Sequence, residues 1–156
     1  MASVIRSAES LAPVLGRDLL LDYRSTSGFF EDADLDSVRR GGVRDLALAN
    51  GLADLEQALA NRLKTRKGEL APLGHPGYGS RHHELIGEPN VDRTRHLIKL
   101  YVLQALRDEP RIERVLAVDV RAEHQPPRET VRITLALRVQ GMAQPLNLVL
   151  PFSLGL

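Results

Sequence analysis

Apolar residues recur along the middle of the chain with the period of an α-helix. Between Ala49 and Lys67 a stripe of leucines is spaced three or four residues apart, which is typical of a helix with one buried face: Leu52, Leu55, Leu59 and Leu63. Asn50 is expected to cap the start of this helix, and Gly68 is expected to end it in a left-handed conformation. The first main helix is therefore predicted over Ala49–Lys67.

A second helix is predicted over Asp92–Arg107, with Asp92 as its cap. Its apolar residues fall on one side, namely Leu97, Ile98, Tyr101, Val102, Ala105 and Leu106. Pro110 forces the residue before it out of helical geometry, so the helix is expected to end at or just before Glu109. Between the two helices, Leu70–Ser80 is rich in glycine and proline and is predicted to be a loop.

The last third of the chain changes to the two-residue period of β-strands. Apolar and polar residues alternate from Val131 to Val139, and the alternation returns from Leu146 to Phe152. Together with Ile112–Arg121, these segments predict a three-stranded antiparallel meander. Pro145 and Pro151 lie in its last strand, and because proline lacks a backbone donor this strand is expected at the edge of the sheet.

The first third of the chain has a less regular pattern. Val4–Leu15 has helical spacing that Pro13 interrupts, so this segment is expected to be either an arm that docks on a neighbour or a frayed end. Arg17–Tyr23 is short and apolar at its centre, which favours a strand. Gly28–Gly42 is polar and is interpreted as an ordered loop.

These elements predict an α+β fold, in which two main helices pack on a small antiparallel sheet with an extended C-terminal β-hairpin. A docking segment is expected over residues 1–15 and a single domain over residues 16–156. The length of 156 residues and the hydrophobic content of 43% are sufficient for one domain with one core.

Charge and cysteine content exclude several classes of partner and site. The chain has 21 Lys and Arg against 20 Asp and Glu, so its net charge of +1 predicts no binding of nucleic acid. It has no cysteine, and therefore neither a disulfide framework nor a thiolate metal site. No apolar run approaches the ~20 residues of a membrane span, and Met1–Gly16 lacks the pattern of a signal peptide. We therefore expect a soluble, cytosolic protein.

No arrangement of residues predicts catalysis or a bound metal. His75, His82 and His83 are close in sequence, but adjacent histidines point in different directions and no cysteine can complete a zinc site. Ser80 lies in a segment similar to the start of a nucleophile elbow, but the position that needs the second glycine is His82. Four glutamates are candidate acids, with no pair placed across a cleft: Glu69, Glu84, Glu88 and Glu109. The sequence therefore predicts no enzyme, no metal and no cofactor.

Glu109, Pro110 and Arg111 form a corner between the second helix and the first strand of the meander. Because proline restricts the backbone, the carboxylate and the guanidinium are expected at a rigid position. Such a pair suits charge-assisted hydrogen bonds to a protein partner, and it equally suits an internal salt bridge. The sequence leaves both roles open.

The C-terminal hairpin is the second candidate interaction site. An apolar edge strand with free backbone donors and acceptors invites pairing with another chain. The side chains expected to take part alternate along the two strands: Val131, Ile133, Leu135, Leu146, Leu148 and Leu150. The alternative is that the hairpin only completes the sheet of its own domain.

Several short motifs occur in the order of a known family. They begin at Gly16–Leu19, and the strongest local matches are Leu63–Leu70 and Leu73–Ser80. Glu109–Arg111 matches a signature tripeptide. Over residues 16–152 the chain resembles the baseplate wedge and sheath-initiator family of contractile phage tails, which also has members in type VI secretion and extracellular contractile injection systems.

The resemblance implies a structural protein that binds the wedge scaffold around the tube and starts sheath polymerisation by strand exchange. The implied partners are baseplate wedge proteins, sheath subunits and tube or hub proteins, with several copies in a symmetric ring. Assembly is expected in the bacterial cytoplasm, before the protein becomes part of the phage-like particle or injection machine. Two alternatives are a regulatory protein-binding module of similar fold and a peptidoglycan hydrolase, since the family has also been labelled lysozyme-like.

Overall fold

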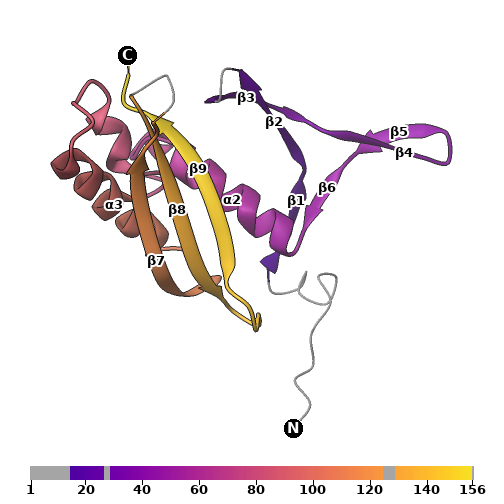
Figure 1. The fold of residues 1–156 in the computed structure, drawn as a ribbon. Coiled ribbons are helices and arrows are strands. Elements are labelled where there is room, and N and C mark those ends of the chain that lie inside the picture. The colour runs from indigo at the N-terminus through magenta and orange to yellow at the C-terminus, as the bar shows by residue number, and fades with distance from the viewer. Residues whose placement is uncertain (1–14, 27–28, 125–128, 156) are drawn as a thin grey trace, which may run out of the picture. The chain divides into compact units, whose positions relative to one another are not determined.

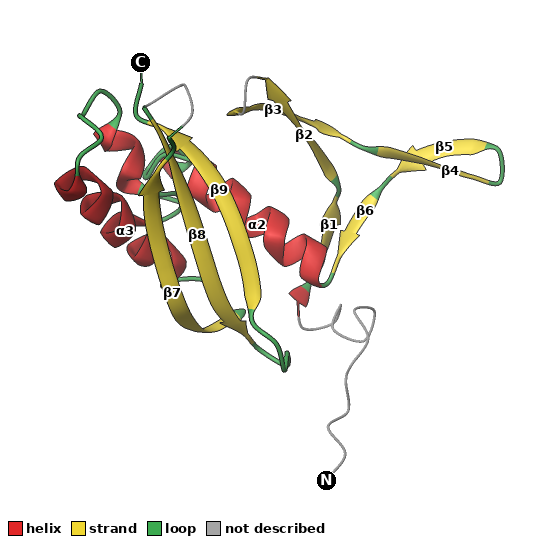
Figure 2. Cartoon of the chain, viewed as in Figure 1, coloured by secondary structure: helices red, strands yellow, loops and turns green. Residues whose placement is uncertain are grey.

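The computed structural model describes residues 15–26, 29–124 and 129–155, and Figures 1 and 2 show its helices and strands. The predicted α+β class is confirmed: the described residues form two main helices, short two-stranded ribbons and a C-terminal three-stranded sheet. They divide into two compact units. The first runs to Ala58 and includes Gly141–Ala143, and the second contains Leu59–Gln140 and Gln144–Leu156. The segment Val4–Leu15, expected to be a docking arm or a frayed end, lies outside the described residues except for Leu15.

Helix α2 spans Leu52–Lys64, so it is shorter at both ends than predicted. Asn50, predicted as its cap, lies instead in strand β6 (Leu48–Asn50). The Asn50 Oδ1 accepts a hydrogen bond from Arg17 Nε at 2.6 Å. Gly51 has a φ of 60° and turns the chain from strand β6 into helix α2. Asn50 therefore ends the strand and does not cap the helix.

Helix α2 ends before Thr65 because the chain there pairs with the end of the following loop. Ser80 N–H donates to Thr65 O at 2.9 Å. Gly79 has a φ of +94°, and a Cβ at this position would lie 2.6 Å from Arg66 O. Gly68 is left-handed as predicted, with a φ of +83°, but it lies in the turn after the helix and does not end it.

Replacing Gly79 with alanine is expected to lower the free energy of unfolding by about 2–3 kcal/mol, because the new Cβ would meet backbone in a left-handed conformation. Urea denaturation measures the change. Gly77→Ala is the matched control, since nothing lies within 4 Å of a Cβ there. Equal losses in the two variants would contradict the close approach between Gly79 and the end of α2.

Helix α3 spans Asp92–Leu106, close to its predicted range. Asp92 is its first helical residue, and the cap position is Val91, whose side chain makes no capping hydrogen bond. The buried side chains are Thr94, Ile98, Val102, Ala105 and Leu106. The loop predicted over Leu70–Ser80 contains the 3₁₀ helix η1 (Ala71–Leu73), and a second 3₁₀ helix, η2 (Arg81–Leu85), follows it. None of the described helices is long and apolar enough to cross a membrane.

The C-terminal sheet confirms the predicted meander. Strands β7 (Ile112–Ala122), β8 (Thr130–Val139) and β9 (Leu146–Ser153) pair antiparallel in this order, so the last strand lies at an edge of this sheet. Residues at every second position of β8 are buried, namely Val131, Ile133, Leu135, Leu137 and Val139. Helix α3 packs against β7 and supplies apolar side chains to the same core.

The described residues between Arg17 and Asn50 form three two-stranded antiparallel ribbons. They pair β1 (Arg17–Leu19) with β6, β2 (Leu21–Thr26) with β3 (Phe29–Leu35), and β4 (Ser37–Arg40) with β5 (Val43–Leu46). The strand predicted over Arg17–Tyr23 is confirmed as extended chain, but it is divided at Leu20 into β1 and the start of β2. The loop predicted over Gly28–Gly42 is wrong. These strands escape a period-based prediction because β4 and β5 are exposed at every position, so no alternation marks a buried face.

The three ribbons meet at a triangle of backbone hydrogen bonds. Leu20 N–H donates to Ala47 O at 2.9 Å, Ala47 N–H to Asp36 O at 3.0 Å, and Asp36 N–H to Leu20 O at 2.9 Å. The buried Gln57 side chain of α2 holds the chain on either side of Leu20. Its Oε1 accepts from Leu21 N–H and its Nε2 donates to Leu19 O, both at 2.8 Å. Figure 1 shows the ribbons leaving this junction in different directions.

Candidate functional site

The corner after α3 is built around a buried carboxylate. Glu109 is 5% exposed, and Arg111 binds it with two nitrogens. The Nε–Oε1 distance is 2.6 Å, and the Nη2–Oε2 distance is 3.1 Å. The Arg111 backbone N–H also donates to Oε1 at 3.3 Å. Such a bidentate pair combines charge with a defined geometry.

A second arginine reaches the same carboxylate from α2. Arg62 Nη2 lies 3.7 Å from Glu109 Oε2, and the Arg62 guanidinium lies 4.7 Å from the centre of the Tyr78 ring. Burial works to raise the pKa of Glu109, but the hydrogen bonds and charge of Arg111, with the charge of Arg62, hold that pKa below its usual range. Glu109 therefore stays ionised inside the fold.

The predicted internal salt bridge is thus present, and the three candidate partner-binding residues differ in access. Glu109 is buried, Arg111 is half-buried and Pro110 is exposed. Gln140 ties the corner to the end of β8, since its Nε2 donates to Pro110 O at 2.7 Å and its N–H donates to Arg111 O at 3.0 Å. A partner at this corner would meet Pro110 and the outer side of Arg111.

The six side chains proposed for sheath binding line the core of the second unit. Leu148 is half-buried, and the others are buried: Val131, Ile133, Leu135, Leu146 and Leu150. A partner strand could not reach these side chains without opening the sheet. What a partner can reach is the backbone along the outer edge of β9 and the side chains on the opposite face, of which Val149 is 53% exposed.

The two edges of the C-terminal sheet differ in regularity. Strand β9 pairs with β8 over eight successive residue pairs without a shift in register. Strand β7 shifts register twice, between Ile112 and Arg114 and between Val115 and Ala117. Bulges of this kind disturb the backbone ladder and discourage further pairing. The regular open edge is therefore that of β9.

Sequence reasoning missed a buried pair formed by Ser80 and His82. His82 is 3% exposed, its Nδ1 lies 2.7 Å from Ser80 Oγ, and its ring stacks on His83 at 4.3 Å between centroids. The Phe152 ring meets His82 edge-on at 4.4 Å. Burial, helped by the charge of His83, lowers the pKa of His82 to about 3. The only signal in the sequence is the two-residue spacing between Ser80 and His82.

This pair lacks the access that a hydrolase needs. Ser80 is 1% exposed, so no substrate carbonyl can approach its hydroxyl from solvent. The histidines also gather no metal site: the described residues contain no group of three or more His, Cys, Asp or Glu that could hold an ion. The Ser80–His82 pair therefore has a structural role in the fold.

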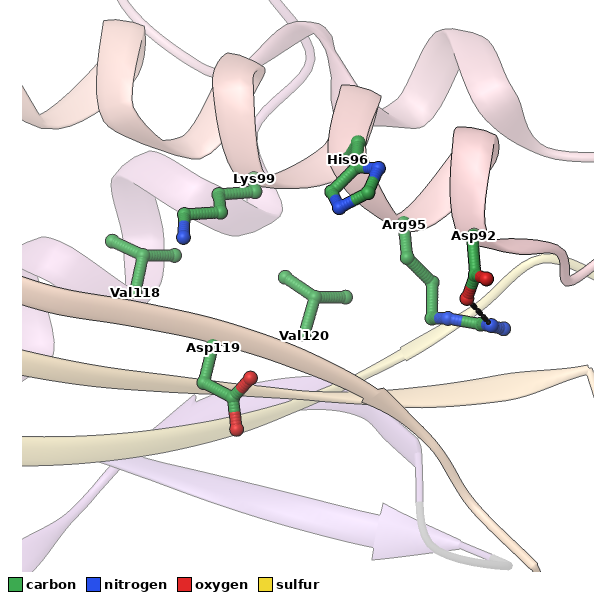
Figure 3. Close-up of a pocket in the computed structure, with 7 residues that line it drawn as sticks. All are labelled: Asp92, Arg95, His96, Lys99, Val118, Asp119 and Val120. Atoms are coloured by element: carbon green, nitrogen blue, oxygen red, sulfur yellow. Dashed lines mark hydrogen bonds and ion pairs between the residues drawn. The ribbon is translucent and has the colours of Figure 1, made fainter.

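A groove between α3 and β7 has a volume of about 130 Å³. Seven residues line it: Asp92, Arg95, His96, Lys99, Val118, Asp119 and Val120. Figure 3 shows Lys99 and His96 reaching from α3 toward the two valines of β7. Asp92 forms an ion pair with Arg95, and Asp119 pairs with Arg121 at 2.5 Å. Because both carboxylates are held by arginines, they do not form the free acid pair of a glycosidase.

Comparison with known proteins identifies relatives of this architecture. The family model of baseplate wedge protein gp25 (GPW_gp25) matches residues 49–144. A crystal structure of a Geobacter sulfurreducens protein that carries the name tail lysozyme is 28% identical, with a TM-score of 0.55 over 64% of this chain and 87% of that one. A chain in the baseplate complex from the type VI secretion system is 24% identical, with a TM-score of 0.49 over 62% and 88%. No curated protein matches the chain.

Proposed function

We propose that this chain starts the sheath of a contractile injection machine by accepting a sheath strand along β9. The family match covers more than half of the chain, which therefore belongs to the family of baseplate wedge protein gp25. The family resemblance of its motifs is thereby confirmed, and its role in the baseplate is structural. The observation that carries the finer proposal is the open, regular edge of β9. Strand addition at such an edge satisfies backbone groups on both partners.

Proline positions indicate which residues of β9 face outward. Pro151 has no N–H, and a proline inside an edge strand is tolerated where the missing donor would face away from the sheet. Successive residues point their backbone groups to opposite sides. The N–H groups of Asn147, Val149 and Ser153 are therefore the donors offered to an incoming strand. Their partners would be carbonyl groups of a sheath subunit.

The corner at Glu109, Pro110 and Arg111 is the proposed contact with the wedge scaffold. Its support is the rigid presentation of Pro110 and Arg111, which Glu109, Arg62 and Gln140 hold in place. Several copies would sit around the tube in a symmetric ring, next to tube or hub proteins. Assembly would take place in the bacterial cytoplasm, and the finished protein would remain in the particle.

A non-catalytic role is part of the proposal. The hydrolase alternative is disfavoured because the Ser80–His82 pair is buried and the carboxylates of the α3–β7 groove are bound to arginines. The regulatory alternative would use the same fold without a sheath. Sheath assembly therefore distinguishes the alternatives better than a binding assay does.

The test is a proline at Val149, which is exposed on the edge strand. Val149→Pro removes an outward N–H, whereas Val149→Ala shortens the side chain and keeps that donor. Both variants are expected to fold like the wild type, because the ladder to β8 does not use this N–H. In particles assembled with the variant as the sole copy, Val149→Pro is expected to give baseplates and tubes without sheath, and Val149→Ala normal particles.

Circular dichroism and thermal unfolding of the purified variants establish that each one is folded. Normal sheath on Val149→Pro particles would overturn strand addition at β9 and favour the alternative that the hairpin only completes its own sheet. Loss of baseplates as well as sheath would also count against it, since the edge is proposed to act after the baseplate forms.

A further inference from the structure

The face of the C-terminal sheet opposite the buried positions of β8, which we call the open face, carries two pairs of facing arginines. Arg114 of β7 lies opposite Arg138 of β8, and Arg121 lies opposite Arg132. All four side chains are exposed. Like charges directly opposite each other destabilise a strand pair, so each of these pairs calls for carboxylates that balance it.

The pair formed by Arg121 and Arg132 is balanced within the chain. Arg121 Nε lies 2.5 Å from Asp119 Oδ2, and Arg132 Nε lies 2.5 Å from Glu123 Oε1. Each of these arginines therefore has a carboxylate of its own. This end of the open face needs no charge from outside.

The pair formed by Arg114 and Arg138 is not balanced in this way. Neither side chain forms an ion pair with any side chain that the structure describes. Glu113, which the register shift at the start of β7 leaves unpaired in the ladder, is exposed and forms no ion pair with either arginine. The next residues on the same face are Ala117 and Ala136, which pair with each other across the strands and bring no charge.

This unbalanced pair lies next to the corner that is proposed to contact the wedge scaffold. Arg138 is two residues from Gln140, whose side chain donates to Pro110 O at 2.7 Å. Arg114 follows Arg111 by three residues, at the start of β7. Because two residues of an extended chain span only about 7 Å, a partner that rests on Pro110 has both guanidinium groups within reach.

We propose that Arg114 and Arg138 bind the carboxylates of an acidic segment in the wedge protein that contacts the corner. The inference rests on the proposed wedge contact and names the chemistry of its partner. A guanidinium binds a carboxylate through two parallel hydrogen bonds, which fix orientation as well as charge. Opposite charges across an interface also steer the encounter and exclude wrong partners. The small side chains of Ala117 and Ala136 leave room for the backbone of the segment to approach.

Two matched double variants test the inference, since each removes two positive charges from the open face. Arg114→Gln/Arg138→Gln removes the unbalanced pair, and Arg121→Gln/Arg132→Gln removes the balanced one. Each full-length variant is produced together with the wild type, and mass spectrometry compares their ratio in purified baseplates with their ratio in the lysate. Arg114→Gln/Arg138→Gln is expected to be depleted from baseplates at least about tenfold, because it lacks the contacts to the acidic segment. Arg121→Gln/Arg132→Gln is expected to be incorporated like the wild type.

Urea denaturation of the purified chains separates lost contacts from lost folding. Arg114→Gln/Arg138→Gln is expected to unfold at the same urea concentration as the wild type or at a higher one, because it removes a repulsion and no ion pair. A clear loss of stability in this variant would overturn the inference, since the two arginines would then have their balancing charges inside the chain.

Arg111→Ala, incorporated in the same competition, distinguishes this inference from the proposed function. Depletion of Arg111→Ala with normal incorporation of Arg114→Gln/Arg138→Gln would overturn the acidic segment and leave the wedge contact in place. Normal incorporation of both would overturn both. Equal depletion of the two double variants would also overturn the inference, because the loss would then follow from net charge. Depletion that nuclease treatment of the lysate abolishes would assign the arginines to a nucleic acid and overturn it as well.

Discussion

Replacing Glu109 with alanine is expected to lower the free energy of unfolding by about 3–5 kcal/mol, because removing one partner of a buried ion pair leaves the other charge uncompensated. Here two cations lose their partner, Arg111 at 2.6 Å and Arg62 at 3.7 Å. Glu109→Gln keeps the size and one acceptor but loses the charge, so an intermediate loss is expected. Urea denaturation at neutral pH measures both.

The control for this prediction is Glu84, whose carboxylate forms an exposed ion pair with Arg81 at 2.9 Å. Surface pairs contribute little because solvent screens them, so Glu84→Ala is expected to leave stability unchanged within error. A comparable loss in Glu84→Ala and Glu109→Ala would contradict the importance of burial at the corner.

Arg111→Ala distinguishes the two roles of this corner, the internal ion pair with Glu109 and the proposed contact with the wedge scaffold. Arg111 is half-buried and binds the Glu109 carboxylate through its Nε at 2.6 Å. The variant is assayed below its own melting temperature for incorporation into baseplates. Lost stability with normal incorporation would assign the corner an internal role alone. Lost incorporation of a folded chain would support the wedge contact.

The elements that the sequence predicts well are those with a face in the core. Strand β8 alternates because every second residue is buried, and α3 has its predicted range because its apolar side covers β7. In such elements the spacing of apolar residues along the sequence equals the spacing of buried residues in the structure. The ribbons β2–β3 and β4–β5 are held by backbone pairing and by the junction at Leu20, which no side-chain pattern reveals.

The candidate sites show the same division. The sequence predicts a rigid Glu109–Arg111 corner because the restriction comes from Pro110 itself. It cannot predict that Arg62 from α2 completes the ion pair, because that contact depends on the tertiary packing. The hairpin residues were predicted on one face correctly, but an apolar face alone does not distinguish a partner surface from the chain's own core. In this chain Ile133 and Leu135 are buried in the core, and their role in sheath binding stays a prediction.

Acidification from pH 6.5 to pH 4 is expected to destabilise the protein through the buried His82. The unfolded chain binds a proton at His82 near the ordinary value of 6.5, whereas burial lowers the pKa of the folded chain to about 3. Between these values the unfolded state binds more protons, so stability is complete above pH 6.5 and falls as the pH is lowered. The complete shift corresponds to roughly 4–5 kcal/mol.

His83 adds to this loss, because burial lowers its pKa as well, although the hydrogen bond to Leu63 O opposes the shift. His82→Asn removes one titrating group and keeps a side-chain amide near Ser80. Its free energy of unfolding is expected to depend less steeply on pH than that of the wild type between pH 6 and pH 5. Urea denaturation at a series of pH values gives both slopes. A wild-type slope in His82→Asn would show that His82 is not the buried neutral group that its contacts with Ser80 and Phe152 indicate.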